Sequence, residues 1–188
     1  MLNAGYLTTT LLLGNFLLCL RDDPTAASRL RAERSAIPQA IEEALRHRPP
    51  LPGVHRITTQ EAEIAGTVIP ASKFVTLSVL SANHDERHFA DPDRFDIDRE
   101  PDKHMAFGHG IHFCLGAPLA RLEAEIALGV LFDEFAELDV SGEVEYHTTE
   151  FYGPKRLSVT AKRQSQNRKP PNEPENPKSK QRRKTASR

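Results

Sequence analysis

The 188-residue chain has no tryptophan and only two cysteines, and hydrophobic residues make up 38% of it. With a mean hydropathy of −0.50, this composition excludes a protein that crosses a membrane many times. Cys19 and Cys114 are too few and too far apart to form a disulfide framework or a structural zinc site. We therefore expect two free thiols in a reducing compartment.

The chain also lacks a GxGxxG motif, so nothing in it indicates a binding site for a flavin or nicotinamide cofactor. It has no internal repeat, which excludes a solenoid or propeller array. The length suits one ordinary domain with a hydrophobic core.

Charge is distributed unevenly, although the net charge is only −1. Residues 162–188 contain ten Lys or Arg against two Glu, a net charge of +8, and the preceding residues carry −9. The same segment has no Val, Ile, Leu, Met or aromatic residue that could be buried to offset the entropy of ordering. We expect a domain over 1–161 and a disordered basic tail over 162–188. Such tails are usually solvated, so we do not expect nucleic-acid binding.

Residues 1–20 contain no charged residue, and their length approaches the roughly 20 residues that a membrane-spanning helix needs. Asn3, Thr8, Gly14 and Asn15 interrupt the apolar run, and no basic residue precedes it as in a secretory signal. The pattern favours a helix that is buried on most sides over a signal peptide or membrane anchor.

Prolines and hydrophobic periodicity divide the rest of the chain into short elements. Asp23 followed by Pro24 is typical of a helix start, and Pro49 ends the next helical pattern. The segment 90–104 is rich in Asp, Pro and Arg and predicts a long irregular loop. The fold class is mainly α with small β-sheets (α+β). The expected helices cover 25–35, 38–47 and 114–135, the strands 54–57, 66–69 and 74–80, and a hairpin 144–159.

The most informative segment is FGHGIHFCLG, residues 107–116. Glycines at 108, 110 and 116 allow tight turns and a close approach of the backbone to a flat partner. Cys114 lies at the start of a predicted helix, where the helix dipole favours a thiolate. Isolated cysteines usually act as small buried hydrophobes. Phe, Gly, Cys and Gly at these spacings should nevertheless occur by chance in on the order of one chain in a thousand.

This decapeptide resembles the cysteine-ligand loop of the cytochrome P-450 family of haem-thiolate monooxygenases. The resemblance implies that Cys114 is the axial ligand of the iron of haem b. It also implies that Phe107, Gly108 and Gly116 take part in binding the cofactor. A cysteine ligand donates electron density to iron and favours cleavage of the O–O bond.

A second match to the family is Glu43 and Arg46, which form its ExxR pair on the helix before the first strands. Alone, such a helical pair is ordinary and contributes about 0.2 to 0.5 kcal/mol. Residues 92–95 (PDRF) resemble the family's meander segment. The resemblance therefore implies a structural cluster of Glu43, Arg46 and Arg94.

Residues 4–9 (AGYLTT) resemble the segment of the helix that crosses the distal face of the haem. The resemblance implies that Thr8 is catalytic and hydrogen-bonds dioxygen and its protons, within a helix that is locally opened. The alternative is a threonine that bonds back to the carbonyl four residues earlier. Leu7 stands where the family usually has Asp or Glu, so another group or water relays protons here, or turnover is less well coupled.

Other positions match family residues that line the cofactor and substrate. Arg56 and His112 match residues that hold the haem propionates, and both side chains can donate to carboxylates. A surface arginine and a loop-bracing histidine are the alternatives. The substrate-lining candidates, which core packing explains equally well, are Val54, His55, Phe151 and Tyr152.

The reaction implied by the resemblance inserts one atom of dioxygen into a small apolar substrate. Electrons would come from a ferredoxin or flavodoxin with its reductase. The motifs are similar to those of the soluble bacterial branch, so a cytoplasmic protein without a membrane anchor is expected.

The resemblance covers residues 2–160 and implies an incomplete, C-terminal portion of the family's fold. We expect a truncated monooxygenase or, as the alternative, a non-catalytic remnant that acts as a haem-binding or interaction module. The first helix should then lack packing partners and promote aggregation. Its residues expected to be exposed are Leu11, Leu12, Leu13, Phe16, Leu17 and Leu18.

Overall fold

Helix α1 (Leu2–Asp22) opens the chain in a computed structural model that describes residues 2–100, 103–147 and 150–164. Asp23 then caps helix α2 (Pro24–Ala32), since its carboxylate accepts hydrogen bonds from the backbone of Thr25 and Ala26 at 3.0 and 3.1 Å. A 3-10 turn, η1 (Arg34–Ala36), leads into α3 (Ile37–His47). The predicted helices over 25–35 and 38–47 are confirmed, except that the first ends in this turn.

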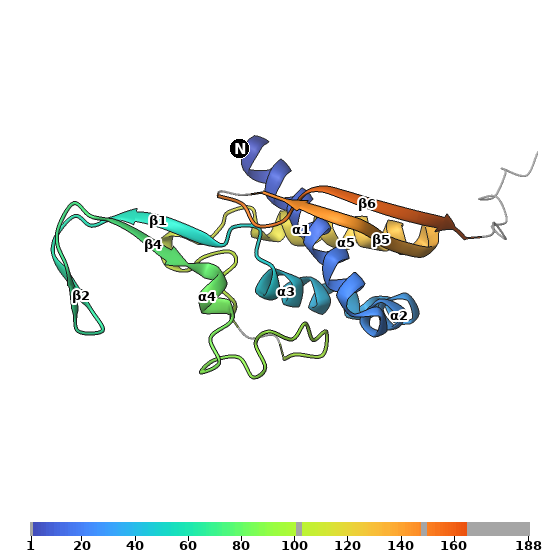
Figure 1. Cartoon of the computed structure of the whole chain (residues 1–188), viewed down its shortest axis with the longest axis horizontal. Helices are drawn as coiled ribbons and strands as arrows, with labels where there is room; N and C mark the ends of the chain where they lie inside the picture. The colour runs from blue at the N-terminus through green and yellow to red at the C-terminus, as the bar shows by residue number, and fades with distance from the viewer. Residues whose placement is uncertain (1, 101–102, 148–149, 165–188) are drawn as a thin grey trace, which may run out of the picture.

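Two small antiparallel hairpins follow and form an arm that projects away from the helices (Figure 1). Strand β1 (Gly53–Ile57) pairs with β4 (Phe74–Ser78), and β2 (Ala62–Ile64) pairs with β3 (Thr67–Ile69). The sequence did not predict β2, which has three residues and too short an apolar pattern to stand out. The strand predicted over 74–80 ends early because the Ser78 hydroxyl accepts from the Ser81 amide at 3.2 Å and caps α4 (Val79–Asn83).

The described residues between α4 and the short 3-10 turn η2 (Gly110–His112) form no helix or strand, which agrees with the irregular segment predicted over 90–104. Helix α5 (Ala117–Glu134) then passes directly into β5 (Phe135–Tyr146), which pairs with β6 (Pro154–Arg163). The predicted hairpin is present, but the range predicted for it, 144–159, is shorter than the two strands observed. A register shift between Phe135 and Glu137 interrupts the alternation that would have marked its start. Strand β6 also ends two residues beyond the predicted domain end at 161.

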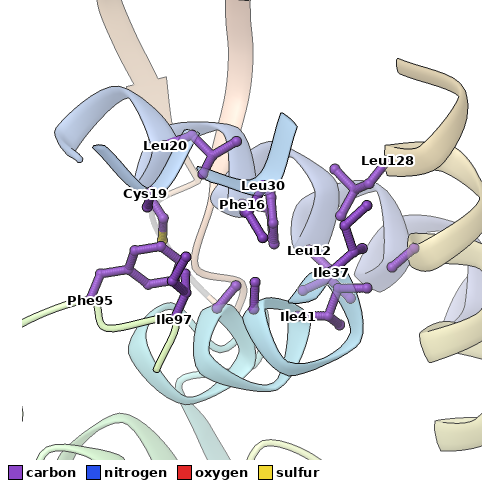
Figure 2. Close-up of a cluster of buried hydrophobic side chains, with 14 of the residues drawn as sticks. Leu12, Phe16, Cys19, Leu20, Leu30, Ile37, Ile41, Phe95, Ile97 and Leu128 are labelled. Atoms are coloured by element: carbon purple, nitrogen blue, oxygen red, sulfur yellow. The ribbon is translucent and has the colours of Figure 1, made fainter. Parts of the chain in front are cut away.

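The core lies where α1 crosses α3 and α5, with the β5–β6 hairpin along α1 and α5 (Figure 1). Figure 2 shows Leu12 and Phe16 of α1 directed at side chains of α3 and α5. The expectation that the leucines of the first helix are exposed is wrong. Four of the six residues are at most 2% exposed, and Leu13 and Leu17 are half-buried. The four are Leu11, Leu12, Phe16 and Leu18.

One exposed apolar surface lies instead on α5. One side of this helix is buried through Ala117, Ala124, Leu128 and Phe132. The opposite side is more than half exposed, and we call it the outer face of α5. The outer face consists of Leu119, Leu122, Ile126 and Val130. A helix that is apolar on two opposite sides is typical of one packed between two layers.

None of the helices in the described part of the chain combines the length and the apolar character needed to span a bilayer.

Candidate functional site

The loop at residues 107–116 turns back on itself so that Cys114 returns to Phe107. The Cys114 amide donates to the Phe107 carbonyl at 2.9 Å, and the Phe113 amide donates to the Gly110 carbonyl at 3.0 Å. Gly108 and Gly110 have φ angles of 74° and 66°, which residues with a side chain rarely adopt. Both glycines are therefore needed for the curl of the loop.

Cys114 is exposed, and its neighbours are apolar and exposed as well. Ile111 is 98% exposed, Leu115 is 85% exposed and Phe113 is half exposed. A thiol surrounded by outward-facing apolar side chains suits a partner that is itself apolar and carries a metal ion that a thiolate can ligate, as haem does. The residues present therefore fit a haem whose iron is ligated by sulfur.

Cys19 has the opposite surroundings. It is 1% exposed, in contact with Phe95 and Ile97 in the core shown in Figure 2. Burial raises the pKa of its thiol to about 12. Cys114 is thus the only one of the two thiols that is open to an external partner.

We expect iodoacetamide to alkylate native protein at Cys114 and to spare Cys19. At pH 8 a pKa of about 12 leaves about one Cys19 thiol in ten thousand ionised, and the side chain is also shielded by the core. Peptide mapping after timed alkylation measures both rates. Cys19 should react only after unfolding in guanidinium; equal rates in native protein would contradict the burial of Cys19.

A buried ion pair on α3 joins the helix to the irregular segment after α4. The Arg46 guanidinium donates to both carboxylate oxygens of Glu43, at 2.7 and 2.9 Å. It also donates to three backbone carbonyls at 2.8 to 3.0 Å, those of Asn83, Pro92 and Arg94. Both side chains are at most 3% exposed, so the pair holds the irregular segment from inside.

The predicted role of the Arg94 side chain in this cluster is wrong. The Arg94 guanidinium is 69% exposed and faces Asp96 at 3.8 Å, and only its backbone carbonyl meets Arg46. Arg99 takes the third position instead, with its Nε 3.1 Å from a Glu43 oxygen. Arg99 also donates to the carbonyls of Ala90, Asp91 and Arg94, so it closes the irregular segment on itself.

Thr8 lies in an unbroken helix, and its hydroxyl donates to the Ala4 carbonyl at 2.5 Å. The locally opened helix expected from the resemblance is not present in α1 as the structure describes it. The bond back to residue 4 is the alternative raised from the sequence, and it satisfies the hydroxyl within the helix. To donate to dioxygen, as the proposed role of Thr8 requires, the hydroxyl must give up its hydrogen bond to the Ala4 carbonyl.

Arg56 and His112, the predicted propionate ligands, are both exposed. Arg56 lies in β1 and donates to the His55 carbonyl at 2.7 Å. His112 ends the η2 turn, two residues before Cys114. Both present N–H donors on the surface, and propionate binding remains a prediction.

The candidate substrate-lining residues lie in two places, β1 and the turn after β5. His55 has its Nδ1 3.1 Å from the Thr76 hydroxyl, on the strand paired with its own. Val54 and Phe151 are half-buried. Tyr152 ties its turn to the helices, because its carbonyl accepts from the Asn15 side chain at 2.9 Å. A substrate role for these four residues remains a prediction.

Sequence reasoning missed a second ion pair that lies next to the cysteine loop. The Arg121 guanidinium donates to both oxygens of Glu42 at 2.7 Å, and the His104 Nε2 lies 3.2 Å from Glu42. Arg121 also covers the Phe107 ring, with its guanidinium carbon 4.6 Å from the ring centre. We call Glu42, Arg121 and His104 the brace. The available sequence signal was the adjacent pair Glu42 and Glu43. Because Glu43 pairs with Arg46, Glu42 indicates a second basic partner.

Comparisons with known proteins agree with this geometry. The sequence profile described as "Cytochrome P450", here cytochrome P-450, matches residues 1–153. Cyclomarin C epoxidase CymV of Salinispora arenicola is 49% identical over 161 residues, which are 85% of this chain and 41% of that protein. Erythromycin C-12 hydroxylase of Saccharopolyspora erythraea is 46% identical over 147 residues, which are 77% of this chain and 37% of that protein.

Solved structures are similar over the same extent. The ligand-free structure of cytochrome P-450 TbtJ1 is 48% identical and superposes with a TM-score of 0.82, covering 84% of this chain and 43% of that one. The testosterone complex of CYP109E1 from Bacillus megaterium is 44% identical with a TM-score of 0.80, covering 83% and 44%. The chain thus spans about two fifths of the length of these relatives.

Proposed function

Because the chain belongs to the cytochrome P-450 family, we propose that it forms the cysteine-ligand part of a haem-thiolate monooxygenase. The proposed reaction inserts one atom of dioxygen into a small apolar substrate. The observation that carries the proposal is the exposed Cys114 thiol. The Phe107 carbonyl accepts a hydrogen bond from its backbone, and exposed apolar side chains surround it. The names of relatives include an epoxidase and a hydroxylase, which are oxygen-inserting activities.

The residues that would hold haem b are those of the loop and its surroundings. Cys114 would supply the sulfur ligand, and the left-handed backbone at Gly108 would let the loop lie flat against the porphyrin. Phe107 and Gly116 would complete this contact, and Arg56 and His112 would donate to the propionates. When bound, haem with a thiolate ligand supplies the chemistry that cleaves the O–O bond.

The outer face of α5 indicates how the rest of the enzyme is arranged. The four apolar side chains of this face are exposed to water, although the opposite side of the helix is already buried. Such a helix is expected to pack against a second layer of protein on its exposed side. The relatives contain more than twice the length that this chain spans. We propose that the remaining part of the P-450 fold packs on this face, and that activity needs it. Without it, the alternative is a haem-binding or interaction module with no turnover.

Electrons are proposed to come from a ferredoxin or flavodoxin with its reductase. Among the relatives, names and titles mention three different compounds, namely cyclomarin C, erythromycin and testosterone. For this chain we therefore propose a substrate class, an apolar organic molecule, and no particular compound.

The test of the proposed function uses the chain together with the remaining part of the fold, haem, a redox partner pair and isotopically heavy dioxygen. We expect one heavy oxygen atom in each product molecule. Product labelled only from water, or substrate-independent consumption of electrons with every candidate substrate, would overturn the proposal.

Thr8 is proposed to hold a proton at its hydroxyl for delivery to dioxygen. Thr8→Ala should therefore raise the share of electrons lost as hydrogen peroxide, because it removes one positioned proton donor. Thr10→Ala is the matched control, because the Thr10 hydroxyl makes the same kind of bond, 2.8 Å to the Tyr6 carbonyl. Peroxide release per electron pair measures the effect, and equal values for the two variants would contradict a role specific to Thr8.

A further inference from the structure

The brace connects the helix that carries the buried Glu43–Arg46 pair to the helix that begins after Cys114. Glu42 comes from α3 and Arg121 from the second turn of α5. The two parallel bonds of 2.7 Å match the fork of a guanidinium to both oxygens of a carboxylate. Such a pair fixes direction as well as distance, which a single ammonium group would not do.

The brace is shielded on one side by a nearly buried ring. His104 is 6% exposed, and its Nε2 contacts the same Glu42 oxygen that Arg121 Nη2 does. The Nδ1 of the ring accepts from the Ala106 amide at 3.2 Å, one residue before the cysteine loop. The carboxylate of Glu42 is thus connected through the His104 ring to the backbone just before the loop.

Arg121 connects this pair to the cysteine. Its guanidinium lies on the Phe107 ring, an arrangement that attracts a cation to the face of the ring. The carbonyl of the same residue, Phe107, accepts the hydrogen bond from the Cys114 amide. A continuous set of contacts therefore runs from Glu42 through Arg121 and Phe107 to the backbone of Cys114.

We propose that Arg121 is a positioning residue that holds Phe107 in place and thereby sets the direction of the Cys114 thiolate toward the haem iron. The haem part of this statement rests on the proposed function. The positioning of the loop does not, because all of its contacts lie within the chain.

The charges of the brace support a permanent contact. Burial raises the pKa of Glu42, but hydrogen bonds from Arg121 and His104 outweigh it and lower the pKa to about 2. A carboxylate with a lowered pKa stabilises the fold fully above its ordinary value of 4.5 and loses that contribution as the pH falls toward 2. The hydrogen bond to Glu42 raises the pKa of Arg121, and the nearby Cys114 thiolate raises it further.

The test compares amide hydrogen exchange in the 188-residue protein and three variants. Arg121→Gln should speed exchange in the peptide over residues 105–116 by about tenfold and leave the peptides of β5 and β6 unchanged. Arg121→Lys keeps the charge but loses the fork and the flat stacking surface, so it should give an intermediate rate. Arg87→Gln is the control, because Arg87 forms a bidentate pair with Asp85 on the surface.

Unchanged exchange at 105–116 in Arg121→Gln would overturn the proposal. Equal acceleration over the whole chain would also overturn it, because that result indicates loss of global stability. A second readout is the ferrous carbon-monoxide spectrum after haem loading, in which Arg121→Gln should lose about half or more of the thiolate band. If wild-type protein shows no such band while the exchange pattern holds, the proposed function fails and the positioning of the loop by Arg121 stands.

Discussion

Arg46→Met should lower the free energy of unfolding by about 3 to 5 kcal/mol, the cost of breaking a buried ion pair by removing one partner. Arg46 is 2% exposed and donates five hydrogen bonds. Methionine fills a similar volume but removes the main partner of the Glu43 carboxylate and one donor from each of three carbonyls, of which that of Arg94 keeps its bond from Arg99. A loss of this size is a large fraction of the stability of most domains. Urea unfolding followed by circular dichroism measures it.

Arg94→Met is the matched control and should change the free energy of unfolding by less than about 0.5 kcal/mol. Its guanidinium is mostly exposed, and its contribution to the cluster is a backbone carbonyl that the substitution keeps. Arg99→Met should fall between the two, because Arg99 is 13% exposed and shares Glu43. A larger loss for Arg94→Met than for Arg99→Met would restore the cluster expected from the sequence.

The double variant Leu122→Lys, Ile126→Lys should shift the 188-residue chain from self-associated species toward the monomer. Both side chains are more than half exposed at the centre of the outer face of α5. Burying the exposed half of each such side chain against a partner stabilises association by roughly 1 kcal/mol, so unpartnered chains should associate through this face. Light scattering after size-exclusion chromatography measures the change.

In the presence of the remaining part of the fold, the same two substitutions should prevent assembly and haem retention. Glu123→Lys, on the same helix and also exposed, is the control for added positive charge and should do neither. A wild-type chain that is monomeric alone, or a double variant that still assembles, would contradict the role proposed for the outer face.

The sequence predicted four of the described α-helices, the irregular segment and the cysteine loop well, because each has a local signal; α4 was missed. Residues 107–116 contain the glycines that the left-handed backbone at 108 and 110 requires. Asp23 and Pro24 mark a helix start that the structure confirms through the cap of α2. Such features depend on residues that are adjacent in the chain, so the sequence alone is enough to predict them.

Side-chain partners across long segments were predicted less well. Arg94 and Arg99 lie in one irregular segment, and only its path decides which guanidinium reaches Glu43. Likewise, the apolar repeat that predicted α5 includes its outer face, because periodicity identifies a helix without saying which side is covered. The leucines of α1 were expected to lack partners, but α3 and α5 bury them within this chain. The disordered tail was predicted to begin at 162, but Lys162 and Arg163 belong to β6; from 165 onward this prediction lies outside the described residues.

The most direct test of Cys114 as the haem ligand is the absorption spectrum of reduced, carbon-monoxide-bound protein after loading with haem. We expect the red-shifted Soret band of a thiolate-ligated haem, its loss in Cys114→His and its retention in Cys19→Ser. Because Cys114 is exposed and Cys19 is buried in the core, the two substitutions separate ligation from general damage. A band that survives Cys114→His, or one that disappears in Cys19→Ser alone, would contradict the assignment of Cys114 as the haem ligand.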